Sequence, residues 1–424
     1  MAAVSTRAEK PRGWAGRLAL IAYLIIAVAI GLEVLLRVFP SAIPLRLLRH
    51  FDDNLRISIA QRLGMPTRLM VREIARDDGG PPLFMSLPHV TYPLDERDPG
   101  GPVIIMDDRG FCNSPAAQNP PIDAITVGGS ISWCVAVPPD GTWTARLGQL
   151  SGLRTYNMSV PGVGPYEYLQ VVKQFGAALH PRFVFFDFAA GNDLRDILAT
   201  DLYRAGHPSG QAEGAQQTVL REQGGGFLAR NSYLYALIRA ALIRETGADN
   251  GERFKDEAGL PDRHKLDFRF HLKWGDRVIA MNVDNGDTDE PYHAMAVERG
   301  LVDLDRLRRP FEQLAELGKR LHFKPIVTYT PAAYTVYDDV AVFNDPAMAP
   351  LMRKFNEKQL AYVSALTAEL GLTFVDLTPA LRAAAAELKD RDLLYIPENL
   401  HLLAAGHRVI AQALAKRTAD LTKQ

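Results

Sequence analysis

Cysteine is scarce in this sequence, with two copies among 424 residues, Cys112 and Cys134. They do not form a C-x-x-C pair, which excludes the common zinc and redox motifs built on cysteine. If the protein is exported, the two can form a disulfide, and both flank the segment around Ser130, which favours their proximity. The alternative is a pair of buried free thiols.

An excess of charge of one sign is also missing. The 48 Lys and Arg residues balance 49 Asp and Glu residues, so the formal net charge is −1. Nothing in this balance indicates a nucleic-acid partner. No repeat of solenoid type occurs either. The hydrophobic fraction of 47% is enough for a large core, and the length predicts more than one domain.

One long apolar run stands near the N-terminus, "LALIAYLIIAVAIGLEVLL" at 18–36, and its one charge is Glu33. A helix needs roughly 20 apolar residues to cross a bilayer. We therefore predict an uncleaved transmembrane anchor through 18–36, within an N-terminal region 1–39 whose start is a cytoplasmic tail. The alternatives are a cleaved signal peptide, because "AVA" at 27–29 resembles a cleavage site, and a buried soluble helix.

The orientation of this anchor does not follow from charge. As many arginines follow the apolar run, at 37, 46, 49 and 56, as there are basic residues before it, so the positive-inside rule does not decide. Residues 43–64 alternate apolar and basic side chains at helical spacing, as in a helix lying on a membrane surface. The whole segment 40–120 is rich in Pro, Gly and Asp, and we predict an irregular juxtamembrane stretch.

From residue 121 onward, strand and helix patterns alternate. We predict strands at 124–127, 154–160, 182–190, 324–330 and 373–378, and helices at 142–150, 165–179, 301–321, 352–371 and 404–421. This order predicts an α/β domain over 121–420 in which helices cover a parallel sheet. A polar, glycine-rich insertion at 195–290 interrupts it, with one helical patch at 232–245, and we interpret it as a lid-like subdomain.

Three loops that follow predicted strands carry candidate catalytic groups, "VGGS", "NMSVPGVG" and "AAGND". Ligands of open parallel sheets bind at the carboxyl ends of the strands, where these loops converge. Ser130 ends the first loop, and a serine needs a base to become nucleophilic at neutral pH. His401 is the best candidate base, because Glu398 precedes it by three residues and can accept a hydrogen bond from one ring nitrogen.

Acyl transfer also needs donors directed at the oxyanion. The Ser130 backbone N–H is one candidate, and Gly162 offers a second because a glycine lets the backbone approach closely. The Asn192 side-chain amide is a third candidate. Each has a structural alternative: Gly162 as a turn glycine, and Asn192 as part of a helix cap.

Four blocks resemble a known family. "VGGSISW", "NMSVPGVGPYEY", "AAGND" and "PENLHLLAAGH" are similar to the four blocks of the SGNH/GDSL hydrolase superfamily, most of all its membrane-anchored bacterial branch with a GGS-type first block. The resemblance implies a three-layer α/β/α flavodoxin-like fold without metal or organic cofactor. It also implies Ser130 as nucleophile, His401 as base and Glu398 as acid, with the Ser130 amide, Gly162 and Asn192 forming the oxyanion hole.

This sequence departs from the family pattern at three positions. Gly129 stands where an acidic residue is usual, Glu398 replaces the usual aspartate with a side chain one methylene longer, and Cys134 replaces a common glycine. The longer Glu398 needs a shifted backbone to reach His401. Cys134 would tie its loop down if it pairs with Cys112.

The expected function is a cell-envelope serine esterase that removes ester groups, chiefly O-acetyl groups of a carbohydrate. The first alternative is a polysaccharide O-acetyltransferase with the same triad and a membrane-bound acyl-transfer partner. The second is a catalytically inactive module for carbohydrate binding or assembly. The family resemblance implies a single-pass protein of the bacterial inner membrane with its catalytic domain in the periplasm.

Overall fold

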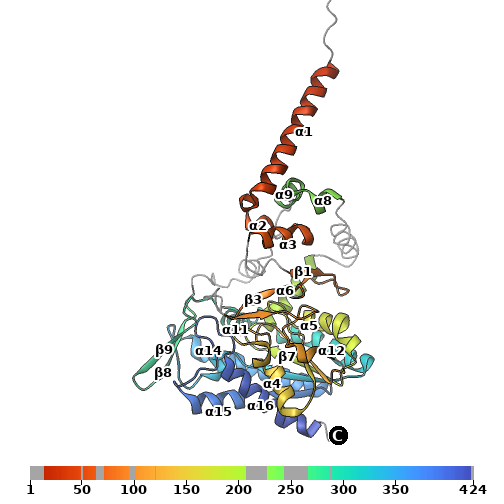
Figure 1. Cartoon of the computed structure of the whole chain (residues 1–424). Coiled ribbons are helices and arrows are strands. Elements are labelled where there is room, and N and C mark those ends of the chain that lie inside the picture. Colours follow the sequence, from red (N-terminus) through yellow and green to blue (C-terminus); the bar gives the residue numbers. More distant parts are fainter. Residues whose placement is uncertain are drawn as a thin grey trace, which may run out of the picture. The chain divides into compact units, whose positions relative to one another are not determined.

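The computed structural model describes residues 14–48, 51–63, 71–94, 102–119, 121–206, 227–242, 266–286 and 288–421. The chain forms two compact units, which are described separately (Figure 1). The N-terminal unit comprises Met1–Val71 together with Gln217–Thr246. The catalytic unit, named for the site described below, comprises Arg72–Gln216 and Gly247–Gln424.

A five-stranded parallel sheet organises the catalytic unit. Its strands are β5 (Ala124–Val127), β6 (Thr155–Asn157), β7 (Phe183–Ala189), β10 (Lys324–Thr330) and β12 (Thr373–Asp376), in the spatial order β12-β10-β7-β5-β6. Numbered along the chain, this order is the 2-1-3-4-5 arrangement of flavodoxin-like sheets. Every residue of the central strand β7 is buried, as expected for a strand covered on both faces. The predicted α/β fold is confirmed.

Successive side chains of β7 point to opposite faces of the sheet, and helices cover both faces. Phe185 lies edge-on to Trp143 of α4 (Trp143–Ser151), with ring centroids 6.3 Å apart. Its neighbour Phe186 points the other way, 5.3 Å from Tyr168 of α5 (Pro165–Val171) and 5.8 Å from Phe311 of α12 (Arg308–Leu321). Helix α16 (Ala404–Leu421) packs beside α4, whereas α5, α12 and α14 (Met348–Glu369) pack together in the opposite layer. The sheet therefore lies between two helical layers.

The predicted insertion 195–290 is structurally divided. Its first part belongs to α6 (Asp193–Gly206), which buries Leu194, Ile197 and Leu198 at helical spacing. Its later part forms β8 (Phe270–Trp274) and β9 (Arg277–Met281), which join β11 (Ala341–Phe343) in a three-stranded antiparallel sheet, and the start of α11 (Asp289–Glu298). Residues 207–226 and 243–265 lie outside the described part. Burial of a few apolar residues among many polar ones explains why composition alone indicated a loop-rich lid.

The segment 40–120 is more regular than predicted. It contains α2 (Leu45–Leu48), α3 (Asp53–Arg62), β1 (Val71–Ile74), β2 (Leu83–Ser86), β3 (Thr91–Pro93) and β4 (Val103–Ile105). Strands β1 and β2 pair with each other, and so do β3 and β4. From Arg72 onward the segment belongs to the catalytic unit, because residues such as Met85 and Phe111 join the main core. The segment 40–120 is therefore divided between the two units.

The N-terminal unit combines distant parts of the sequence. Helix α1 (Trp14–Val38) is followed by α2 and α3, and α8 (Phe227–Asn231) and α9 (Tyr233–Leu242) join them. Leu36, Ile43, Phe51 and Tyr233 belong to their shared core. The stretch Gly16–Val38 has a mean hydropathy of 2.6, and no part of its most apolar window is buried in the protein. By length and composition it suits either a membrane span or a signal sequence.

Candidate active site

Ser130 lies just beyond the carboxyl end of β5, after Gly128 and Gly129. A Cβ atom at residue 128 would lie 2.9 Å from the Ser132 Oγ and 3.1 Å from the Asp187 Cβ, so a side chain there would collide with its neighbours. The glycine therefore allows the chain to turn sharply against the sheet. Ser130 emerges half-buried at the rim of this turn.

His401 meets Ser130 across 271 positions of sequence. Its Nε2 atom lies 2.8 Å from the Ser130 Oγ, a hydrogen-bond distance that suits proton transfer between a nucleophile and its base. The backbone that carries His401 is fixed within its own loop, in which Tyr395 and Leu402 form an isolated β-bridge. The backbone N–H of Ile396 donates to the His401 carbonyl at 2.7 Å.

Glu398 lies in the same loop, half-buried, three residues before His401. The loop turns tightly here, because the Leu400 N–H donates to the Ile396 carbonyl at 2.9 Å and Leu400 has a φ of +55°. The Asn282 N–H donates to the Pro397 carbonyl at 2.7 Å and holds the loop from outside. The backbone around Glu398 is therefore tightly turned and fixed from two sides. Its role as the acid that orients His401 stays a prediction.

Gly162 and Asn192 stand on loops beyond β6 and β7, the two neighbours of β5 in the sheet. Gly162 has a φ of +74°, a left-handed conformation that favours glycine. The Val160 N–H donates to the Gly128 carbonyl at 3.0 Å, which joins the second loop to the first. The Asn192 Oδ1 is buried and has no hydrogen-bond partner among the described residues. The loops expected to form the oxyanion hole thus follow three adjacent strands, while the donors themselves stay predicted.

A buried hydrogen-bond network centred on Asp187 lies next to the serine turn, and it was not predicted from the sequence as part of the site. Asp187 of β7 accepts a hydrogen bond from the Ser132 hydroxyl, and Thr328 and Thr330 of β10 donate to it at 2.7 and 2.6 Å. The Trp143 indole N–H donates to the Ser132 Oγ at 3.1 Å. Burial raises the pKa of Asp187, and the three hydroxyl donors oppose that rise. A single carboxylate within the apolar strand "RFVFFDFAA" is the sequence signal for this network.

Tyr168 and Asp193 form a second buried contact that supports the nucleophile loop. The Tyr168 hydroxyl donates to the Asp193 Oδ1 at 2.8 Å, and the Ala189 N–H donates to the Oδ2 at 3.0 Å. Burial and the nearby Asp196 raise the pKa of the Asp193 carboxyl. A Cβ atom at residue 129 would lie 3.0 Å from the Tyr168 hydroxyl oxygen. The tyrosine therefore occupies the space that an acidic side chain at position 129 would need.

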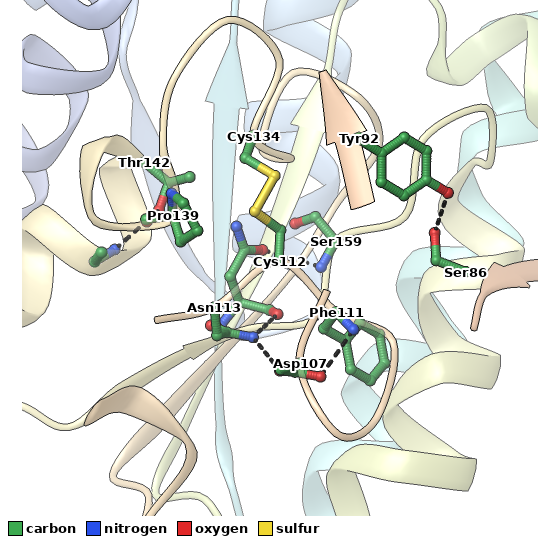
Figure 2. The surroundings of a disulfide bond; sticks show 12 residues. Ser86, Tyr92, Asp107, Phe111, Cys112, Asn113, Cys134, Pro139, Thr142 and Ser159 are labelled. Carbon is green, nitrogen blue, oxygen red and sulfur yellow. Dashed lines mark hydrogen bonds between the residues drawn. A yellow bond between two sulfur atoms is a disulfide. The ribbon is translucent and has the colours of Figure 1, made fainter. Parts of the chain in front are cut away.

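A disulfide joins Cys112 to Cys134 in the structure, with Cα atoms 6.3 Å apart (Figure 2). It links the segment before β5 to the turn that carries the serine. Beside it, the Asn113 side-chain amide donates to the Asp107 Oδ2 at 3.0 Å and to the Asn157 carbonyl at 2.8 Å. The nucleophile turn is thereby attached to β6 and to the preceding segment.

The fold and the site together define a class: a flavodoxin-like α/β protein that places a serine hydroxyl against an imidazole at the carboxyl ends of parallel strands. Such a pair can carry out nucleophilic acyl transfer without a metal. Among the described residues, no group of three His, Cys, Asp or Glu side chains is arranged to hold a metal ion.

Comparison with known proteins gives structural likenesses at low identity. No model of a protein family and no curated protein matches the chain. A protein of Desulfitobacterium hafniense assigned to the G-D-S-L family of lipolytic proteins is 10% identical with a TM-score of 0.32, and the match covers 69% of this chain and 98% of that one.

Two acetylxylan esterases show similarly low identities and TM-scores. One is 11% identical with a TM-score of 0.35 over 70% of this chain and 99% of the other. The second, from Geobacillus stearothermophilus, is 14% identical with a TM-score of 0.34 over 70% and 93%. With TM-scores below 0.5, the function has to be inferred from the chain's own residues.

Proposed function

We propose that this protein is a serine esterase that acts on O-acetyl groups of a carbohydrate through Ser130, His401 and Glu398. The observation that supports the proposal most directly is the 2.8 Å contact between the Ser130 Oγ and the His401 Nε2. A contact between residues so far apart in sequence requires the whole sheet to be assembled. The buried supports of the serine turn, from Asp187 below and Tyr168 beside it, are consistent with a preorganised site.

In the proposed reaction, the Ser130 Oγ attacks the ester carbonyl carbon while its proton passes to the His401 Nε2. The carbonyl oxygen becomes an oxyanion, which accepts hydrogen bonds from the Ser130 N–H, the Gly162 N–H and the Asn192 amide. The bond to the alcohol oxygen then breaks, and that oxygen takes the proton from His401. Water next gives a proton to His401 while its oxygen attacks the acyl carbon. The bond from that carbon to the Ser130 Oγ then breaks, the Oγ takes the proton back from His401, and the acid leaves as acetate.

The second half of this reaction determines the class of enzyme. If a sugar hydroxyl replaces water as acceptor, the same acyl-enzyme makes the protein an O-acetyltransferase, and a membrane-bound partner would supply the acyl group. Serine and histidine play the same roles in both cases, so the acceptor is an outcome of the experiment below. An inactive carbohydrate-binding module is a further outcome.

We further propose that α1 anchors the protein in the bacterial inner membrane and that the catalytic unit faces the periplasm. The length and hydropathy of Gly16–Val38 support the anchor. The Cys112–Cys134 disulfide supports an oxidising compartment, because disulfides persist outside the cytosol.

The test uses the full chain in detergent micelles with p-nitrophenyl acetate as substrate. Ser130→Ala and His401→Asn are expected to lower kcat/KM by at least about 10³-fold, because each removes one half of the proton-transfer pair. Ser58→Ala, which alters an exposed serine of the N-terminal unit, is the matched control and keeps the wild-type rate.

The products separate the alternatives. A burst of nitrophenol that disappears in Ser130→Ala indicates an acyl-enzyme. Acetate as the product of an acetylated oligosaccharide supports the esterase, whereas acetyl transfer to an added oligosaccharide, detected by mass, indicates the transferase. Equal rates in wild type and Ser130→Ala would contradict both and leave the binding module.

A further inference from the structure

The one charge in the apolar run 18–36 has specific partners within the N-terminal unit. The Glu33 carboxylate of α1 accepts hydrogen bonds from the Ser232 hydroxyl at 2.8 Å, the Tyr233 N–H at 3.1 Å and the Leu234 N–H at 2.9 Å. Arg37 donates to the same carboxylate from one turn further along α1, at 2.7 Å. Glu33 therefore caps the N-terminus of α9, where unpaired backbone N–H groups and the helix dipole favour a negative charge. A charge with such partners is tolerated in an apolar setting.

Helix α9 is apolar on both sides apart from one charged residue, Arg239. One face, with Tyr233, Ala236 and Ala240, is buried in the core shared with α1 and α2. The opposite face exposes Tyr235, Ile238 and Leu242, with exposed fractions of 44%, 51% and 76%. A surface helix in water normally carries polar residues on its outer side, and a helix apolar all round is buried or in contact with lipid.

The neighbouring helix α8 continues the exposed apolar surface. Its Phe227 and Leu228 have exposed fractions of 78% and 56%. At the end of α1 in the same unit, Val38 and Phe39 are also exposed, at 57% and 56%. The apolar side chains of α8 and α9 are thus part of the same compact unit as the exposed apolar surface of the anchor helix.

We propose that α8 and α9 form a second membrane element, which lies in the lipid interface and is fastened to α1 by Glu33. Helix α9 has 10 residues. At about 1.5 Å per residue its length is roughly 15 Å, too short to span the hydrocarbon core but suited to the boundary between headgroups and acyl chains. The occupant of the exposed face is lipid, because that face belongs to the same unit as the anchor's own lipid-facing surface.

This arrangement changes how the catalytic unit is attached. The chain passes between the two units after Val71, after Gln216 and after Thr246. The catalytic unit is therefore connected to the membrane element by three covalent connections, where a simple anchor would provide one. The inference rests on the proposal that α1 spans a membrane.

The test uses the full chain in phosphatidylcholine vesicles and a nitrobenzoxadiazole fluorophore on single introduced cysteines. The native cysteines are joined in a disulfide and do not react with the label. Ile238→Cys reports on α9, Leu24→Cys on α1, and Val278→Cys on an exposed strand of the catalytic unit, with wild-type exposed fractions of 51%, 53% and 56%. Tyr235→Cys provides a second variant on the same face of α9.

The expected result is blue-shifted emission at positions 24, 238 and 235 that lipids carrying a doxyl group quench at least about 2-fold. Iodide in the water should quench position 278 and leave 238 nearly unchanged. Iodide quenching at 238 and 235, with doxyl quenching retained at 24, would overturn the inference and leave the anchor standing. Blue-shifted emission at 238 that neither agent quenches would show a second copy of the chain on α9, which also overturns it. Loss of doxyl quenching at 24 would reject the anchor itself.

Discussion

Position 129, just before the candidate nucleophile, carries a glycine, and a neighbouring side chain fills the space that an acidic residue would take there. Gly129 leaves room for the Tyr168 hydroxyl, which in turn hydrogen-bonds to the buried Asp193. Tyr168 of α5, supported by Asp193 of α6, thus fills the space beside residue 129. Gly129 therefore reflects a different packing of this loop.

His407 gives a prediction at the scale of a single residue. It is buried, and its Nδ1 accepts a hydrogen bond from the Trp143 backbone N–H at 3.2 Å. Burial, together with nearby Arg146, lowers the pKa of His407 to about 3. The unfolded chain binds a proton below about pH 6.5, whereas the folded chain does not until about pH 3. The stability that the neutral ring provides is therefore complete above pH 6.5 and is lost as the pH falls toward 3.

We expect the free energy of unfolding to fall by about 2 kcal/mol between pH 7 and pH 5 because of this one group. Urea titrations of the full chain at both pH values measure the change. His407→Asn keeps an acceptor for the Trp143 N–H and should remove most of this fall. His322→Asn, at an exposed histidine, controls for the loss of an imidazole. An unchanged pH dependence in His407→Asn would contradict the assignment.

At the scale of elements, the site is a property of loops at strand ends. Ser130, Gly162 and Asn192 follow β5, β6 and β7, and their distance from one another depends on the parallel register of those strands. His401 comes from the loop before α16, whose helix packs against α4 directly after the serine turn. The strands thus set the positions of the loops, and hydrogen bonds and the disulfide hold the loops in place.

The disulfide gives a prediction at this scale. Cys112 and Cys134 are separated by 22 residues. Closing a loop of that size restricts the unfolded chain, which is worth about 3 kcal/mol. Replacing both cysteines by alanine should lower the unfolding free energy of the catalytic unit by about that amount, measured in urea by the fluorescence of its tryptophans.

Reducing the wild-type protein with dithiothreitol should shift its unfolding midpoint as far as the double alanine variant does. The double variant itself should not respond to dithiothreitol. Equal midpoints for the oxidised wild type and the double variant would show that the crosslink does not contribute to stability.

At the scale of the whole molecule, the chain combines an apolar unit and an α/β unit with different surfaces. In the N-terminal unit the large exposed side chains are mostly apolar, as along α1. In the catalytic unit the outer surface of α12 carries charges such as Arg308, which pairs with Glu369 of α14 at 2.6 Å. Such surfaces suit lipid and water respectively.

The proposed orientation predicts the behaviour of C-terminal fusions. Alkaline phosphatase fused after residue 424 should be active, because its disulfides form in the periplasm. Green fluorescent protein at the same place should stay dark, since it does not fold after export in the unfolded state. Fusions to a chain that begins at residue 40 and lacks α1 serve as the control and should reverse both results. An inactive phosphatase and a bright fluorescent protein on the full chain would place the catalytic unit in the cytoplasm.

The sequence by itself determined the features that depend on local pattern. The strands at 124–127 and 324–330, the helix at 404–421 and the apolar run at 18–36 follow from periodicity and composition, because burial of a face repeats with the geometry of the element. The tertiary structure alone decided which distant groups meet. Glu33 caps a helix 200 positions later, and Asp187 receives hydroxyl donors from the turn after β5 and from β10. Such contacts depend on how the layers pack, and no local pattern carries that information.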